Sequence, residues 1–584
     1  MPTITLEHSI LEYIQGINSV KHEPRLWDNW LTEIGCPVEI NNDDHIDIEV
    51  FPDRPDLLSH ETLAKASRSF LNYNIEDTSM NIKKGANIID VDKSLEEVRP
   101  IIMSAIVRGV KTGKNIADKE KFIQSLMDHQ EKLHLTLGRK RKLSSIGVHD
   151  LTKIKPPFKV KTVRSSFKFV PLSENSEMSI AEILNKHPKG IEYAHLMKDL
   201  EVFPIILDSE DNVISFPPII NGEQTTVTTE TNDFFIDVTG WDERACEACL
   251  LLICLALEER GGVIEDLEIV YPDKNNIITP NGEPINYKVP KKLIQKILGV
   301  ELDNSQIKNS ITKMGGRLIE SRTVTNGPNK AERWSDCVIG EIEYIISMPR
   351  WRSDIMHPID IVEDIAIGFG YEKLPEQMSS IHLDSIPLRS AQMNRRIRAS
   401  LRALGLQEVQ SLTLSNERDQ FERTRWREKG KITKIANPIS QDHTILRQYI
   451  LPCLLQILSA NRHQELPQRI YELGHVVNDS KNNYTFSWSC AEVGGGFTAA
   501  KGFVQSIIRD LGIAIDEVLF EPTEEGDGPW LLGRGAKIIV QGIEIGQFGE
   551  IDPIVSEKYG LKTPIHGGEF DIKEINNVAS DPLI

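Results

Sequence analysis

The sequence predicts a multidomain protein of mixed α+β and α/β class. Its 584 residues exceed what a single core can organise, so about three to five domains are expected. Hydrophobic residues make up 40% and charged residues 26%, which is typical of a globular chain that buries ordinary cores. Helical spacing and strand-like alternation replace one another several times along the chain. These changes of pattern divide it into four regions, at residues 1–84, 85–270, 271–375 and 376–584.

Charge and apolar patterning exclude several classes of protein. With 67 Lys and Arg against 86 Asp and Glu, the formal net charge of -19 has the wrong sign for a protein that coats nucleic acid non-specifically. No apolar run approaches the roughly 20 residues that span a bilayer, and the N-terminus lacks a signal-peptide pattern. Seven scattered cysteines do not form a secreted disulfide framework. We expect a cytoplasmic protein without membrane contact, whose RNA contacts are local or shared with a partner.

Region 1–84 has the pattern strand, helix, strand, helix, as in a small α+β domain. Residues 45–50 alternate as a strand does, and FPDRPD at 51–56 then interrupts the regular structure. In the helix that follows, Asp56 or Ser59 can cap the free amides, and Glu61 suits the first turn. Spacings of three and four place on one apolar face Leu63, Ala66 and Phe70.

Region 85–270 is rich in short strand-like runs, such as 100–107 and 234–240, and predicts a separate α+β domain. A long apolar helix from Glu243 to Glu259 is expected to close it, and this helix carries Cys246, Cys249 and Cys254. A CxxC pair can bind a metal or act in redox chemistry. No second CxxC or CxxH pair exists, so a buried structural role is favoured.

Region 271–375 predicts two short helices in a helix-turn-helix-like arrangement. Their apolar positions are Leu293, Ile297 and Leu298 in the first and Ile307, Ile311 and Met314 in the second, which Gly315-Gly316 stops. Region 376–584 alternates helices with strands, as in a domain built on a mainly antiparallel sheet.

Four carboxylates gather in WRSDIMHPIDIVED at 351–364. Pro358 suits a first helical position, so Asp360, Glu363 and Asp364 lie on one helical face. Asp354 precedes the helix and can fold back toward that face, which gives an all-oxygen site suited to Mg²⁺. Acidic residues near a helix start also complement the helix dipole, and on spacing alone that simpler explanation is favoured.

The run GRKRK at 138–142 is basic within an acidic chain. It fits an RNA phosphate contact and a solvated turn about equally well. The sequence has no GxGxxG after a strand, no Walker A motif, no GxSxG and no HExxH, so the standard single-chain chemistries lack support.

Several long strings resemble phenylalanyl-tRNA synthetase β subunits of the archaeal and eukaryotic type. FPDRPDLL at 51–58 resembles an element near the N-terminus of those subunits, and SIGVHDL at 145–151 and ISFPPIING at 214–222 are similar to elements of their B3/B4 editing domain. The stretch 352–371 resembles the B5 domain. Asn437-Pro438, Leu446-Arg447 and Leu451-Pro452 resemble the synthetase-like C-terminal domain. The resemblance covers nearly the whole chain, and we find neither the OB fold nor the anticodon-binding module of the bacterial form.

The resemblance implies a supporting subunit of an (αβ)₂ heterotetramer. In this family the α subunit activates phenylalanine with ATP and transfers it to tRNA(Phe), while the β subunit's C-terminal domain is a related, inactive class II fold. RIYELG at 469–474 looks like a remnant of the ATP-binding motif, but the glycine-rich strand with its arginine is not recognisable around 567–570. We therefore expect no independent adenylation. By resemblance, a Mg²⁺ site shared with the α subunit has the ligands Asp354, Asp360, Glu363 and Asp364.

The resemblance also implies a hydrolytic editing site in region 85–270. A pocket built for phenylalanine cannot strongly reject tyrosine, so errors of about one in a hundred need removal by hydrolysis. By resemblance, the pocket surrounds Ile206 or Leu207, Ser215, Asn221, Asp237 and Thr239. Asp237 or Glu223 would accept the tyrosine hydroxyl, and Ser215 and Thr239 would orient water or the ester. No nucleophile triad is evident, so covalent catalysis is not expected.

Two other interpretations remain open from the sequence. A free-standing editing hydrolase would not need the B5-like and C-terminal domains. A non-enzymatic scaffold or RNA-binding module built on the helix-turn-helix-like segment fits poorly with the acidic composition.

Overall fold

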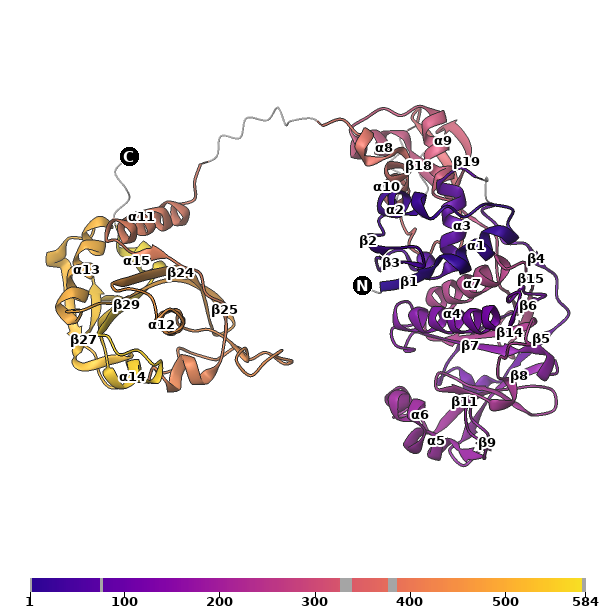
Figure 1. The fold of residues 1–584 in the computed structure, drawn as a ribbon, viewed down its shortest axis with the longest axis horizontal. Coiled ribbons are helices and arrows are strands. Elements are labelled where there is room, and N and C mark those ends of the chain that lie inside the picture. Colours follow the sequence, from indigo (N-terminus) through magenta and orange to yellow (C-terminus); the bar gives the residue numbers. More distant parts are fainter. Residues whose placement is uncertain (1–2, 74–76, 326–338, 377–385, 580–584) are drawn as a thin grey trace. The chain divides into compact units, whose positions relative to one another are not determined.

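The computed structural model describes residues 3–73, 77–325, 339–376 and 386–579, and it forms two compact units, 1–378 and 379–584 (Figure 1). Mixed α and β structure in several sheets confirms the predicted fold class. Within the described ranges, no helix has both the length and the apolar character needed to cross a bilayer. The three proposed boundaries between the four regions stay predictions.

The N-terminal part of unit 1 is a three-stranded sheet, in the order β1-β3-β2, packed against three helices. The elements are β1 (Thr3–Glu7), α1 (His8–Ile17), α2 (Pro24–Glu33), β2 (Val38–Asn41), β3 (His45–Glu49) and α3 (His60–Phe70). The predicted order strand, helix, strand, helix matches β1, α1, β3 and α3 but lacks α2 and β2. Ser59 is the cap of α3, because its hydroxyl accepts the Thr62 amide at 3.2 Å. Asp56 instead pairs with Arg54.

Two sheets form the middle of unit 1. The seven-stranded sheet runs β13 (Ile220–Asn221), β12 (Val213–Phe216), β11 (Val202–Leu207), β8 (Phe158–Arg164), β5 (Ile88–Val91), β16 (Leu267–Val270) and β17 (Ile277–Thr279). The five-stranded sheet runs β4 (Ile82–Lys83), β15 (Val263–Glu265), β6 (Ile101–Arg108), β14 (Phe234–Gly240) and β7 (Ser144–Asp150). The first sheet is bordered by β9 (Lys168–Phe169), β10 (Met178–Ser179), α5 (Ile180–Lys186) and α6 (Pro188–Tyr193).

Two long helices, α4 (Ile116–Leu135) and α7 (Glu243–Glu258), lie side by side over the five-stranded sheet (Figure 1). α7 is the predicted apolar helix, and its three cysteines are fully buried in the core, as expected for structural residues. Cys337 lies outside the described residues. The sequence analysis missed α4, because polar side chains interrupt its buried face, among them His129, Gln130 and His134.

The last part of unit 1 contains the predicted helix pair, α8 (Lys291–Leu298) and α9 (Asn304–Lys313), followed by α10 (Pro358–Phe369). These helices pack on a sheet in the order β18 (Ile285–Pro290), β20 (Ile342–Met348) and β19 (Arg317–Thr323). Gly315 ends α9 with a φ of 79°, a left-handed conformation that glycine adopts readily. Pro358 occupies the first turn of α10, as its sequence context predicted.

Unit 2 is built on a seven-stranded sheet in the order β21-β24-β25-β29-β28-β27-β26, antiparallel except between β21 and β24. Its strands are β21 (Gln407–Glu408), β24 (Gln468–Asn478), β25 (Lys481–Ala491), β26 (Val518–Pro522), β27 (Trp530–Val540), β28 (Ile543–Ile551) and β29 (Ile565–Asp571), with a separate pair β22 (Leu414–Ser415) and β23 (Ile445–Leu446). Its helices are α11 (Arg389–Ala403), α12 (Leu451–Ala460), α13 (Phe497–Asp510), α14 (Pro553–Lys558) and α15 (Ile572–Val578).

Candidate functional site

A cavity of about 260 Å³ lies at the edge of the five-stranded sheet, where β7, β14, α4 and the 215–221 segment meet. Its volume is near the lower end of the roughly 300–1,000 Å³ found for small-molecule pockets. Of the seven residues predicted for the editing pocket, three line it, namely Ser215, Asn221 and Asp237. The structure therefore brings part of the predicted set together around one cavity.

Asp237 reaches the cavity from the middle of β14, the strand between β6 and β7. Its Oδ2 lies 2.7 Å from Nε2 of His149 on β7, and Nδ1 of that buried histidine lies 2.8 Å from the Thr225 hydroxyl. Gly147 stands opposite Asp237, where an added Cβ would lie only 2.0 Å from Oδ2. Among the described residues no partner contacts Asp237 Oδ1, so this oxygen is available to a ligand.

Thr239 does not line the cavity, although it lies only two residues after Asp237 on β14. Its hydroxyl accepts a hydrogen bond from Arg99 at 2.7 Å and lies 3.1 Å from the Ser145 hydroxyl. Arg99 also donates to the Thr239 carbonyl at 2.7 Å. Burial lowers the pKa of Arg99 to about 10, which leaves it charged at neutral pH. Thr239 thus fixes a buried guanidinium behind the cavity wall.

The remaining predicted residues have different surroundings. Ser215 and Asn221 pair across β12 and β13, where the serine hydroxyl donates to the amide oxygen at 3.4 Å. Ile206 and Leu207, both on β11, are buried in two separate apolar clusters and do not line the cavity. The Glu223 carboxylate accepts the amide of Ser173, a cavity residue, at 2.7 Å. Glu223 therefore positions the cavity rim.

Arg141, from the basic run, lies inside the cavity wall and is buried. Its guanidinium donates to the carbonyls of Pro218 and Ile219 at 3.2 and 3.0 Å, pairs with Glu131 and lies 4.4 Å from the Tyr193 ring centre. Burial alone would raise the pKa of Glu131, but the hydrogen bond from His134 and the charge of Arg141 lower it to about 2. Arg141 thus joins α4 to the 217–219 segment.

Sequence reasoning assigned no role to His149, Arg99, Glu131 or Ser145. His149 stands in the SIGVHDL string, so the string marked its neighbourhood without showing that its ring would meet Asp237. The contact depends on strand pairing between residues 88 positions apart. Glu131 gave no signal, because α4 itself was not predicted.

The four predicted magnesium ligands are only partly brought together. Arg352, which is buried, donates to Asp354 at 2.7 Å and to Asp364 at 3.0 Å, so a guanidinium already neutralises these two carboxylates. Asp360 accepts the amides of Met356 and His357, both at 2.8 Å, as part of the α10 capping box. Within the described ranges, no three His, Cys, Asp or Glu side chains are arranged to hold a metal ion.

One oxygen of this cluster has no partner. Asp364 Oδ2 is buried without a hydrogen bond in the described part of the chain, and burial raises the pKa of Asp364 against the effect of Arg352. Glu363 is exposed on the same helix. A cation bound by all four carboxylates would have to compete with Arg352.

In the folded unit 1, residues of the FPDRPDLL segment at 51–58 lie close to the carboxylate-rich segment at 351–364. Arg54 binds Asp56 through two hydrogen bonds of 2.9 Å, and both line a small cavity together with Arg352. The charges of Arg352 and Asp354 shift the pKa of Arg54, and the charge of Arg54 shifts the pKa of Asp364. Residues about 300 positions apart therefore form one largely buried cluster of two guanidinium groups and three carboxylates.

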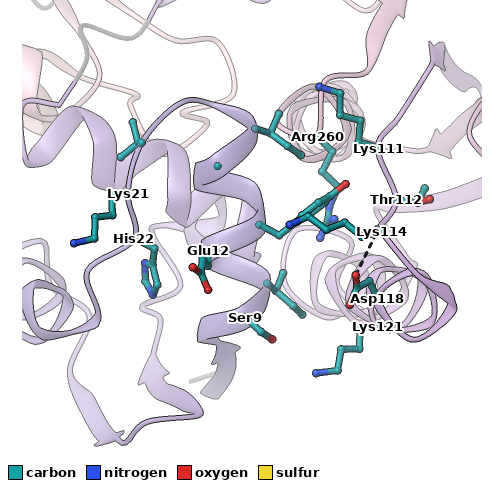
Figure 2. A pocket seen from close by; sticks show the side chains of 15 residues that line it. Ser9, Glu12, Lys21, His22, Lys111, Thr112, Lys114, Asp118, Lys121 and Arg260 are labelled. Atoms are coloured by element: carbon teal, nitrogen blue, oxygen red, sulfur yellow. Dashed lines mark hydrogen bonds between the residues drawn. The ribbon is translucent and has the colours of Figure 1, made fainter.

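A larger cavity of about 760 Å³ lies between α1 and the segment leading into α4 (Figure 2). Figure 2 shows basic and acidic side chains mixed around it, and Asp118 accepts the Lys114 amide at 3.1 Å. Two of its cations are engaged by carboxylates, Lys121 by Glu7 and Arg260 by Glu61. None of the predicted site residues lines this cavity.

The synthetase-like unit buries its own charged residues. Arg447 pairs with Glu472 of the RIYELG string at 2.7 Å, and both side chains are 2% exposed. Glu569, in the strand where the ATP-binding arginine is not recognisable, accepts the amides of Ile450 and Leu451 at 3.0 and 2.8 Å at the start of α12. Burial raises the pKa of Glu569 to about 7. These side chains support α12 and the sheet from inside the unit.

Glu569 predicts a pH dependence of stability. Between its unfolded pKa of about 4.3 and its folded pKa of about 7, only the folded state keeps the proton. The free energy of unfolding of unit 2 is therefore highest below the lower pKa. It falls by roughly 3 kcal/mol as pH rises through this window. Glu569→Gln keeps the acceptor oxygen, so denaturant unfolding of unit 2 within the full chain should lose this decline between pH 5 and pH 8. Glu557→Gln, at an exposed position, is the control, and equal pH dependence in Glu569→Gln and wild type would contradict the assignment.

Three family models match along the chain in order. They are the B3/4 domain at residues 99–248, the tRNA synthetase B5 domain at 287–371 and the phenylalanyl tRNA synthetase beta chain CLM domain at 374–572. The first contains the cavity around Asp237, the second the carboxylate cluster and the third Glu569.

Full-length relatives agree with this order. The chain is 38% identical to the phenylalanine–tRNA ligase beta subunit of Methanosarcina barkeri over 98% of its length and 99% of the relative, and 38% identical to that of Archaeoglobus fulgidus over 98% of each. An N-terminal fragment of the phenylalanyl-tRNA synthetase beta subunit from Pyrococcus horikoshii matches with a TM-score of 0.55 and 34% identity, covering 63% of this chain and 99% of the fragment. The cavity, the carboxylate cluster and the sheet of unit 2 are thus parts of a chain that belongs to the family of phenylalanine–tRNA ligase beta subunits.

Proposed function

We propose that this chain is the β subunit of a phenylalanine–tRNA ligase, working in the cytoplasm beside an α subunit that charges tRNA(Phe) with phenylalanine and ATP. We further propose that its own cavity hydrolyses tyrosine from mischarged tRNA(Phe). Family membership along nearly the whole chain supports the first part. The single observation that carries the second is Asp237, which lines the cavity and whose Oδ1 has no hydrogen-bond partner among the described residues.

The chemistry of the cavity suits discrimination against tyrosine. A buried acceptor forms a hydrogen bond with a ligand that carries a hydroxyl, whereas phenylalanine would leave the same oxygen without a partner. Asp237 is the proposed acceptor, held by His149 on its other oxygen. Ser215 is proposed to orient the ester or the attacking water, and Asn221 to fix the Ser215 hydroxyl. Glu223 and Thr239 are proposed to act by positioning the rim and the wall.

Asp237→Ala should lower hydrolysis of Tyr-tRNA(Phe) by the assembled enzyme at least tenfold, because a hydrogen bond to a charged acceptor contributes about 1.5–3 kcal/mol. Asp237→Asn is the second variant, since it keeps an acceptor for the tyrosine hydroxyl and a partner for His149. Deacylation is followed with labelled tyrosine. Glu12→Ala, at an exposed residue of the larger cavity, is the matched control. Wild-type rates in Asp237→Ala, with phenylalanine charging intact, would refute the assignment.

The proposed partner is a phenylalanyl-tRNA synthetase α subunit in an (αβ)₂ heterotetramer. The burial of Glu472 and Glu569 in structural contacts of unit 2 supports the proposal that the catalytic site for charging lies on α.

ATP-dependent attachment of phenylalanine to tRNA(Phe) should therefore occur when the two subunits are mixed and with neither subunit alone. Charging is measured by acid-precipitable labelled phenylalanine, and the assembly by gel filtration. Charging by this chain alone would overturn the division of labour. Deacylation without any association with α would favour a free-standing editing hydrolase.

We also propose that Asp354, Asp360, Glu363 and Asp364 bind Mg²⁺ in the assembly. An all-oxygen donor set suits this ion, and the partnerless Oδ2 of Asp364 supports a cation near that position. Because Arg352 binds Asp354 and Asp364 in the chain by itself, the complete ligand set requires this pairing to rearrange.

Elemental analysis of the purified assembly should find about one Mg²⁺ per β subunit in the wild type and a loss of it in Asp360→Ala/Glu363→Ala. Glu372→Ala, an exposed position beyond the end of α10, is the control. Metal retained by the double variant, or sub-stoichiometric metal in a well-folded wild-type assembly, would count against these ligands.

A further inference from the structure

The turn between α4 and β7 has an unusual backbone. Arg139, Lys140 and Arg141 have φ values of 45°, 55° and 65°, so three successive residues other than glycine adopt the left-handed conformation. The ends of the turn are joined by hydrogen bonds from the Leu143 amide to the Gly138 carbonyl at 2.9 Å and from the Gly138 amide to the Leu133 carbonyl at 2.9 Å. Such a run is rare for side chains with a Cβ, and glycine would adopt it with less strain. Large basic side chains stand here instead.

One side chain of the turn points inward and the others do not. Arg141 is buried in the wall of the Asp237 cavity and contacts Glu131, Pro218 and Ile219. The two residues before it and the one after it, Arg139, Lys140 and Lys142, are exposed. The contacts of Arg141 therefore hold three exposed cations next to the cavity.

These three cations are not neutralised by the protein. Among the described residues, no carboxylate forms an ion pair with Arg139, Lys140 or Lys142. Many other exposed lysines do have such partners, for example Lys186 with Glu182 and Lys189 with Glu192. In a chain with a net charge of -19, a fixed group of unpaired cations is a local exception that suits a polyanion.

We propose that Arg139, Lys140 and Lys142 bind phosphates of the single-stranded 3′ end of the RNA whose aminoacyl group enters the cavity. The inference rests on the proposed editing function and adds the surface that holds the substrate. An aminoacyl ester in the cavity brings the nearest phosphates of its own RNA close to the cavity mouth. A turn fixed by Arg141 presents its charges there with little loss of backbone freedom on binding.

The triple variant Arg139→Gln/Lys140→Gln/Lys142→Gln tests the proposal in the full assembly. Each phosphate contact to a single strand contributes a salt slope of about 0.7, so the slope of log affinity for tRNA(Phe) against log salt should become shallower by about 2. The KM for hydrolysis of Tyr-tRNA(Phe) should rise about tenfold near 0.1 M salt while kcat changes little. A control triple, Lys84→Gln/Lys168→Gln/Lys198→Gln, removes three exposed lysines elsewhere in unit 1 that form no ion pair with another described residue.

The outcomes separate this inference from the proposed function. Absence of Tyr-tRNA(Phe) hydrolysis by the wild type refutes the editing function, whatever the variants do. If the triple variant hydrolyses Tyr-tRNA(Phe) with the KM and salt slope of the wild type, the phosphate contact is overturned but the editing function is not. An equal effect of the control triple would overturn the phosphate contact in the same way. Should the triple variant unfold at lower temperature, the single variants Lys140→Gln and Lys142→Gln replace it, each with an expected slope change of about 0.7.

Discussion

The candidate site depends on the register in which β14 pairs with β7. Asp237 stands opposite Gly147, and alternate residues of β14 face opposite sides of the sheet. Phe234, Ile236 and Val238 pack in the core with α7, so the strand cannot slip by one residue without exposing them. That register leaves Asp237 on the other side, beside His149 and the cavity. The apolar face thus determines where the acceptor carboxylate lies.

Buried guanidinium groups connect segments of unit 1 that lie far apart in the chain, and each has acceptors. Arg99 binds Thr239 behind the cavity, Arg141 binds the 218–219 carbonyls at its rim, and Arg352 binds Asp354 and Asp364 near α10. A buried charge that loses its partner destabilises a fold by about 3–5 kcal/mol. These pairs therefore hold distant segments in defined positions. A guanidinium carries several donors in one plane, so arginine suits this task better than lysine would.

Unit 2 uses similar chemistry for support. The Arg447–Glu472 pair and the Glu569 carboxylate occupy interior positions of a sheet that resembles a synthetase fold, and their hydrogen bonds end on the protein itself. A carboxylate that binds the first amides of α12 stabilises the start of that helix. These contacts stabilise the unit itself, and the chain's own proposed chemistry lies in unit 1.

Local sequence determined several strands and helices and where some of them begin, although α2, β2 and α4 were not predicted. The strand-like run of β14, the Ser59 cap of α3, Pro358 at the start of α10 and the apolar α7 could all be predicted. Three of the residues that the resemblance named, Ser215, Asn221 and Asp237, line one cavity, and their role there stays a prediction. Only the tertiary structure decided that Ile206 and Leu207 face apolar clusters and that His149 binds Asp237. It also decided that Arg141 turns inward and that Arg352 lies among the predicted magnesium ligands. The physical reason is range: caps and periodicity act over a few residues, whereas partners of buried polar groups are chosen by packing between segments far apart in the chain.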